Sequence, residues 1–160
     1  MSKINFEIVE IVVFRRGAVP EFLVLQRSDD DKIYPGLWQI VSGGIERGEK
    51  AWEAALREVK EEIGVKPRKL YNTPLTNTFY FFINDSVNLS PVFAAEIDPT
   101  IEIKISPEHK NHKWLQKEEA ISSLVWPGQK QAIQSVYDYI ILNNPARGFM
   151  EIPLKHRDKS

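Results

Sequence analysis

Three glutamates stand within one turn of each other in the stretch REVKEEIG, residues 57–64, and they are the first residues of this chain that could do chemistry. Like charges one turn apart destabilise a helix by a few tenths of a kcal/mol per pair, about 0.2–0.5. Either Glu58, Glu61 and Glu62 form an ordinary solvated helix face, or their carboxylates surround a cation. Carboxylate oxygens are hard ligands, which suit Mg²⁺ or Mn²⁺ better than a soft metal.

The element that must position these glutamates is a helix predicted over residues 50–63. Its apolar residues recur at helical spacing, and Gly64 follows as a C-terminal cap. The predicted buried stripe consists of Trp52, Ala55, Leu56, Val59 and Ile63. At about 100° per residue, the three glutamates occupy a sector beside that stripe. Before the helix, the loop 42–49 contains Gly43 and Gly44, which allow a ligand to approach the backbone closely.

The remaining elements are mostly predicted strands. They cover residues 6–14, 22–27, 37–41, 65–71, 77–83, 87–97 and 112–116, with further helices over 117–124 and 128–142. The strands and helices do not alternate as in a doubly wound sheet. This favours an α/β (α+β) class in which a mixed sheet is sandwiched between helices, α/β/α.

One domain is predicted over residues 1–144, followed by a polar tail, 145–160, that breaks at Pro145. The tail is interpreted as a loose arm. The alternative is a segment that docks on a partner subunit, as in a homodimer. In the loop 28–36, the aspartates Asp29, Asp30 and Asp31 fit a polar turn closed by Pro35 and Gly36 better than a metal site.

Composition narrows the class of function. A chain of 160 residues with 42% hydrophobic residues can bury a real core. The net charge of −1 argues against a broad basic surface for nucleic acid. No apolar run approaches the roughly 20 residues of a membrane span, and Glu7 and Glu10 interrupt the apolar N-terminus, which argues against a signal peptide. Without cysteines the chain needs no oxidising compartment, so we expect a cytoplasmic protein that does not bind the membrane.

Taken as one unit, residues 43–65, GGIERGEKAWEAALREVKEEIGV, resemble the Nudix box, the signature of the Nudix hydrolase superfamily. Every fixed position of that signature is matched, by Gly43, Glu49, Arg57, Glu58, Val59, Glu61, Glu62, Gly64 and Val65. A charged amphipathic helix after a glycine loop explains each residue singly, but it does not explain all the spacings together.

The resemblance implies a Nudix fold and a set of roles. Glu58 and Glu62 would be the principal ligands of Mg²⁺, for which Mn²⁺ can substitute, and Gly43 would be a further metal-contacting position. Glu61 would be another ligand or the base that activates water. Arg57 would pair with Glu49 and hold the loop against the helix, and Glu46 is expected to be solvated. The implied reaction is hydrolysis of a phosphoanhydride by substitution at phosphorus.

Outside the box, three stretches look like bacterial dihydroneopterin triphosphate pyrophosphatases. They are LVLQRSDD (23–30), LWQIVSGGIERGE (37–49), and SPEHKNHKWL (106–115) taken with WPGQKQAI (126–133). By this analogy Glu108 would be an extra metal ligand or a general base, and its alternative is a solvated loop carboxylate. Arg27 would contact phosphate, Gly43 and Gly44 would approach the substrate, and Trp38 or Trp126 would stack on a base or pterin unless they are core residues. His109 is expected to be structural or at the surface.

The leading hypothesis is a Mg²⁺-dependent pyrophosphohydrolase that cleaves a nucleoside or pterin triphosphate to a monophosphate and pyrophosphate. One alternative is a diadenosine polyphosphate hydrolase. It rests on Tyr80, 16 positions beyond Gly64, although core packing is the better explanation of the aromatic run 79–82 and is what we predict for it. The alternative of another class is a catalytically silent domain that senses a nucleotide. Intact glutamates argue against it.

Overall fold

The computed structural model describes residues 1–154, and this part of the chain forms one nine-stranded sheet. The strands are β1 (Lys3–Asn5), β2 (Ile8–Arg15), β3 (Glu21–Arg27), β4 (Trp38–Gln39), β5 (Val41–Gly44), β6 (Lys69–Phe81), β7 (Ser86–Ile97), β8 (His109–Leu115) and β9 (Glu151–Ile152). Their order is β4-β3-β2-β7-β6-β9, with β5 on β2, β8 on β3 and β1 on β7. Parallel pairing of β7 with β2 and β1, among otherwise antiparallel neighbours, confirms the predicted mixed sheet.

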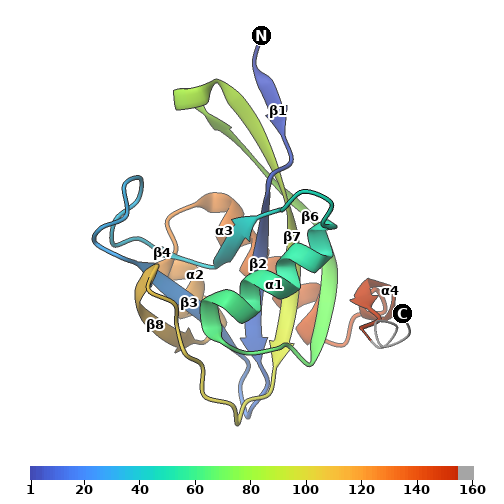
Figure 1. Cartoon of the computed structure of the whole chain (residues 1–160). Coiled ribbons are helices and arrows are strands. Elements are labelled where there is room, and N and C mark those ends of the chain that lie inside the picture. Colours follow the sequence, from blue (N-terminus) through green and yellow to red (C-terminus); the bar gives the residue numbers. More distant parts are fainter. Residues whose placement is uncertain (155–160) are drawn as a thin grey trace.

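The central strand β2 explains why helices lie on both faces. Its side chains alternate, so Val9, Ile11 and Val13 enter one core while Val12 and Phe14 enter the other. Helix α1 (Ala51–Ile63) covers the first face. Helices α2 (Lys117–Ser123) and α3 (Pro127–Val136), the latter continuing into a π-helical turn (Tyr137–Ile141), cover the second (Figure 1). The predicted three-layer α/β/α class is therefore confirmed.

Helix α1 has almost the predicted limits. Lys50 precedes it as the N-cap, and the Lys50 N–H donates to the Glu53 carboxylate at 3.0 Å. The helix ends at Gly64, whose φ of 72° lies in the left-handed region and whose N–H donates to the Lys60 carbonyl. Of the predicted stripe, Ala55, Val59 and Ile63 are fully buried, whereas Trp52 and Leu56 are half-buried.

The middle of the chain differs from the prediction. Residues 65–71 and 77–83 were expected to form two strands, but residues 69–81 form the single strand β6, which is irregular between Asn72 and Thr76. A short 3-10 turn (Phe82–Asn84) then leads into β7. The last part of β6 extends beyond the body of the domain with β7 and β1 (Figure 1). The predicted core packing of the aromatic run is therefore wrong: Tyr80 and Phe82 are 58% and 78% exposed.

The folded domain extends beyond the predicted boundary at residue 144. Helix α4 (Arg147–Met150) leads into β9, which pairs with β6 so that Ile152 lies opposite Leu70. Met150, Ile152 and Leu154 pack against the two cores, so the described part of the tail is not a loose arm. Residues 155–160 lie outside the described residues, and docking of the tail on a partner subunit stays a prediction for them. No helix within residues 1–154 has the length and hydropathy needed to cross a membrane.

Candidate metal and phosphate site

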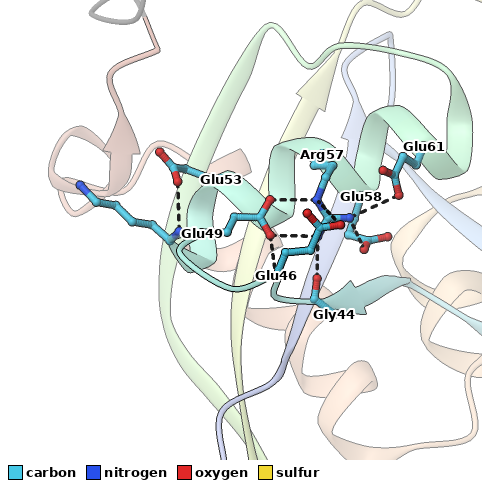
Figure 2. Close-up of polar contacts among 8 residues, drawn as sticks. Gly44, Glu46, Glu49, Glu53, Arg57, Glu58 and Glu61 are labelled. Atoms are coloured by element: carbon cyan, nitrogen blue, oxygen red, sulfur yellow. Dashed lines mark hydrogen bonds and ion pairs between the residues drawn. The ribbon is translucent and has the colours of Figure 1, made fainter.

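Arg57 connects helix α1 to the residues that precede it through several hydrogen bonds (Figure 2). Its guanidinium donates to both carboxylate oxygens of Glu49, at 2.8 and 2.9 Å, and to the Gly44 carbonyl at 2.7 Å. It also donates to Glu58 at 2.8 Å and to Glu61 at 3.3 Å. The loop before the helix is thus fastened to it, as the resemblance implied, and the neighbouring carboxylates, Glu49 first, raise the pKa of Arg57.

The Glu58 carboxylate lies directly against the Gly43 backbone, so any side chain at position 43 would displace it. A Cβ atom at position 43 would lie 2.0 Å from the Glu58 Cδ atom, which no real contact allows. The pairing of β5 with β2, which sets Gly43 opposite Val9, brings this backbone beside α1. Burial raises the pKa of Glu58, even though its bond to Arg57 acts in the opposite direction.

Glu62 is the most deeply buried of Glu58, Glu61 and Glu62. Only 4% of the residue is exposed, and its Oε2 atom is buried without a hydrogen-bond partner. Burial, followed by the negative charges of Glu58 and Glu108, raises the pKa of Glu62 to about 9. Arg27 opposes this shift, but its effect is smaller. A buried carboxylate among other carboxylates is the arrangement that a nearby cation would relieve.

Glu108 reaches the same place from the loop that precedes β8. The Ser106 N–H donates to the Glu62 carbonyl at 2.9 Å, and the Lys104 N–H donates to the Ile63 carbonyl at 3.0 Å, so this loop caps the end of α1. The Ser28 N–H donates to the Glu108 carbonyl at 3.0 Å. The Glu108 residue is exposed and lines a cleft together with Glu62. Glu108 therefore lies at the same cleft as Glu62, although 46 positions separate the two residues in the sequence, and its role as ligand or base stays a prediction.

The cleft has a volume of about 540 Å³, within the usual range for small-molecule sites. Nine of its ten lining residues are polar or charged, and the lining consists of Arg27, Ser28, Asp30, Asp31, Gln39, Ser42, Glu62, Pro107, Glu108 and His109. Several of these residues have no signal in the sequence. The aspartate run has the pattern of a turn, His109 is predicted to be structural or at the surface, and no motif includes Gln39 as a site residue.

Of the three side chains predicted to contact the substrate, one lines the cleft and two lie outside it. Arg27 lines the cleft, where its guanidinium forms an ion pair with Asp31 and donates to Gln39 at 3.0 Å. Trp38 and Trp126 do not line the cleft. Trp38 packs against the second core with Lys113 over its ring, 4.8 Å from the centroid. Trp126 is 41% exposed and meets Tyr34 edge-on at 5.3 Å.

Asp30 and Asp31 line the cleft, and Asp31 also belongs to the predicted turn. Asp31 accepts the N–H groups of Ile33 and Tyr34, both at 2.9 Å, so it closes the predicted polar turn. The Arg27 guanidinium, followed by these backbone donors, lowers the pKa of Asp31 to about 2.

Two other expectations concern residues outside the cleft. The Glu46 side chain is 70% exposed, as predicted, and the Tyr80 hydroxyl donates to Asp85 at 3.0 Å on the extended hairpin.

The donor set fits a hard divalent cation, although the side chains are not preformed around one. Within residues 1–154 no three histidine, aspartate or glutamate side chains converge as a finished metal cage. Glu58 and Glu61 are turned to Arg57 instead. The fit rests on the unpartnered Glu62 oxygen and on the contact between Glu58 and the Gly43 backbone.

The mixed sheet between helices and the carboxylate-lined cleft beside α1 define a small α/β/α domain, and comparison with known proteins identifies its family. Residues 7–136 match the NUDIX domain. The chain therefore belongs to the Nudix family.

Individual relatives share about a quarter to a third of their residues with this chain. The asymmetrical bis(5'-nucleosyl)-tetraphosphatase of Mus musculus is 30% identical over 144 residues, which cover 81% of this chain and 92% of the relative. The nucleoside triphosphatase NudI of Escherichia coli K12 is 26% identical and covers 62% and 76%. The structure of the E. coli dihydroneopterin triphosphate pyrophosphohydrolase superposes with a TM-score of 0.70 at 27% identity, covering 84% of this chain and 94% of that one.

Proposed function

We propose that the protein is a Mg²⁺-dependent pyrophosphohydrolase that cleaves a nucleoside or pterin triphosphate to a monophosphate and pyrophosphate. One observation carries the proposal: the Glu62 Oε2 atom is buried without a hydrogen-bond partner at a polar cleft that Glu108 also lines, and the charges of Glu58 and Glu108 act on Glu62. Membership of the Nudix family supports the reaction class. The cation at this site would be Mg²⁺ or Mn²⁺, because all candidate ligands are hard oxygen donors.

In this proposal Glu58 and Glu62 are the principal ligands, with Glu61, Glu108 and the Gly43 carbonyl available to complete the set. The bound cation would neutralise charge on the phosphate oxygens and orient the attacking water. Arg57 contributes by fastening the loop that contains Gly44 and Glu49 to α1, which fixes the ligands relative to each other.

A general base is needed to accept the proton of the attacking water. Glu108 is the better placed of the two candidates, because it lines the cleft and is exposed, whereas Glu61 does not line the cleft and bonds to Arg57. Arg27 provides positive charge at the same cleft and is proposed to contact a phosphate oxygen through its guanidinium.

Two groups of relatives suggest two substrate classes. The triphosphatase and the dihydroneopterin triphosphate enzyme support a compact triphosphate. The second candidate is a dinucleoside tetraphosphate, which the 30% identical mouse tetraphosphatase favours. Tyr80 gives this second candidate no support, because its hydroxyl bonds to Asp85 on the exposed hairpin.

A substrate panel separates these candidates. Purified protein would be incubated with Mg²⁺ and, in turn, dihydroneopterin triphosphate, the (deoxy)nucleoside triphosphates and diadenosine tetraphosphate, and the products would be resolved by ion-exchange chromatography. We expect pyrophosphate and a monophosphate from a triphosphate. Preferred cleavage of the dinucleotide would favour the second candidate. Binding of nucleotides without turnover of any compound would contradict both and favour a nucleotide sensor.

The matched variants are Glu62→Gln and Glu118→Gln. Glu62→Gln removes the charge of a proposed ligand and should lower kcat by at least 100-fold. Glu118 is an exposed glutamate on α2, and its substitution should leave kcat unchanged. Equal activity of the Glu62→Gln variant and the wild type would show that the ligand assignment is wrong.

A further inference from the structure

A chain of polar side chains leads through the wall of the cleft to Glu62. Asp31 pairs with Arg27, and Arg27 donates to the Gln39 Oε1 atom at 3.0 Å. The Gln39 Nε2 atom lies 3.1 Å from the Nε2 atom of His109. Gln39 and His109 are only 8% and 6% exposed. These buried contacts are therefore shielded from competition with bulk water.

Of the polar side chains that lead to Glu62, Arg27, Gln39 and His109 come from strands that pair in the sheet. Strand β3 pairs with both β4 and β8, with Leu25 opposite Gln39 and Arg27 opposite His109. The ladder between β3 and β8 shifts register between Gln26 and Arg27. Such an irregularity re-aims the side chains that follow it. It lies where Arg27 enters the cleft wall.

The hydrogen-bond pattern fixes which ring nitrogen of His109 carries the proton. A guanidinium can only donate, so the Gln39 oxygen must face Arg27 and the Gln39 NH₂ group must face His109. The NH₂ group donates, so the His109 Nε2 atom accepts. In the neutral ring the proton is then on Nδ1. Arg27 thus sets the tautomer of His109 through one amide.

The protonated His109 nitrogen faces the proposed metal ligand. The His109 Nδ1 atom lies 3.9 Å from the Glu62 Oε2 atom. Both atoms are buried and neither has a hydrogen-bond partner among the described residues. A donor and an acceptor in this relation need a shift of less than about 1 Å to reach hydrogen-bond distance. Hydrogen bonds at such sites are often long before ligands bind and shorten in the complex.

We propose that His109 is a positioning residue that donates from Nδ1 to the Glu62 carboxylate and orients it for the cation, and that Gln39 and Arg27 keep His109 in the tautomer able to do so. The inference rests on the proposed function, in that it takes Glu62 as a metal ligand. Partners behind ligating carboxylates generally change metal affinity by about 10- to 100-fold when removed.

The test compares Gln39→Glu with the wild type by ¹⁵N NMR of the histidine rings at pH 8. A glutamate at position 39 still accepts from Arg27, but its second oxygen can only accept, so it requires a proton on the His109 Nε2 atom. We expect the Nδ1–H tautomer in the wild type and the Nε2–H tautomer in Gln39→Glu. Gln26→Glu adds the same charge at a half-buried position of β3 whose side chain bonds to Gly36, and it should leave the tautomer unchanged.

Mn²⁺ affinity, measured by electron paramagnetic resonance without substrate, is the second readout. His109→Ala and Gln39→Glu should each weaken Mn²⁺ binding by about 10-fold or more. His112→Ala, on the same strand, should not, because the His112 ring makes no hydrogen bond or ion pair among residues 1–154. An Nε2–H tautomer in the wild type, an unchanged tautomer in Gln39→Glu, or wild-type Mn²⁺ affinity in both variants would overturn the inference.

These outcomes are separable from failure of the proposed function. If the wild type binds Mn²⁺ and the variants bind it more weakly, but no triphosphate is hydrolysed, the positioning role stands and the proposed reaction does not. If triphosphate is hydrolysed by the wild type and the variants retain its Mn²⁺ affinity, the reaction stands and the positioning role does not.

Discussion

Replacing Glu62 by glutamine should stabilise the metal-free protein, and increasingly so as the pH rises. In the folded protein, burial and the charges of Glu58 and Glu108 raise the pKa of Glu62 from 4.5 to about 9. Below pH 4.5 the folded and unfolded states both hold the Glu62 proton. Between about pH 4.5 and 9 the unfolded state releases this proton while the folded state keeps it. The contribution of Glu62 to the free energy of unfolding is therefore lost progressively across this window.

The size of the effect follows from proton linkage. One proton bound only by the folded state changes the free energy of unfolding by about 1.4 kcal/mol per pH unit. From pH 5 to pH 8 the wild type should lose on the order of 3–4 kcal/mol through this one group. Glutamine carries no titrating proton, so the Glu62→Gln variant lacks this slope. The difference between the two proteins cancels the titrating groups that do not interact with Glu62.

The assay is urea unfolding followed by circular dichroism, in EDTA, at half-unit steps from pH 5 to pH 8.5. Addition of Mg²⁺ at 100 times its dissociation constant should then stabilise the wild type by about 2.7 kcal/mol and leave the variant unaffected. Glu118→Gln, at an exposed site, serves as the control. A stability difference between Glu62→Gln and the wild type that stays constant with pH would show that the pKa of Glu62 is not raised in the folded protein.

Three further predictions concern the frame around the site. Gly43→Ala forces the Glu58 carboxylate to move, because the new Cβ would meet its Cδ at 2.0 Å, and it should weaken Mn²⁺ binding by at least 10-fold in a calorimetric titration. Arg57→Lys keeps the charge but loses the paired bonds to Glu49, so kcat should fall at least 10-fold in the triphosphate assay, whereas an unchanged kcat would argue against the fastening role. Ile152→Ala removes an apolar side chain that packs against the first core. It should lower the free energy of unfolding, measured in urea, by about 1–3 kcal/mol. Wild-type stability of this variant would show that the tail does not support the domain.

The local part of the site could be predicted from the sequence because it depends on one helix. The period of α1 determines which residues it buries, and the spacing of the Nudix box places Glu58, Glu61 and Glu62 near Gly43 and Arg57. Both are properties of neighbouring residues in the chain. Glu108 was predicted by resemblance, and the loop that caps α1 brings it to the cleft.

The wall of the cleft could not be predicted in the same way. Gln39 and His109 meet only because β4 and β8 both pair with β3, and no local pattern reveals that register. Tyr80 was predicted to pack in the core, but it is exposed. An aromatic strand normally packs in a core, but here β6 continues past the helices that would cover it. The tail was misjudged because Pro145 resembles a terminator, whereas pairing of β9 with β6 is a long-range event.

The most direct measurement of the central claim is an anomalous difference map from crystals grown with Mn²⁺ and a non-hydrolysable nucleoside triphosphate. We expect a Mn²⁺ peak bounded by the carboxylates of Glu58 and Glu62, on the side of the cleft where Glu108 lies, with phosphate oxygens as its remaining neighbours. Bound triphosphate with no manganese peak at these carboxylates, or a peak held by other residues, would contradict it.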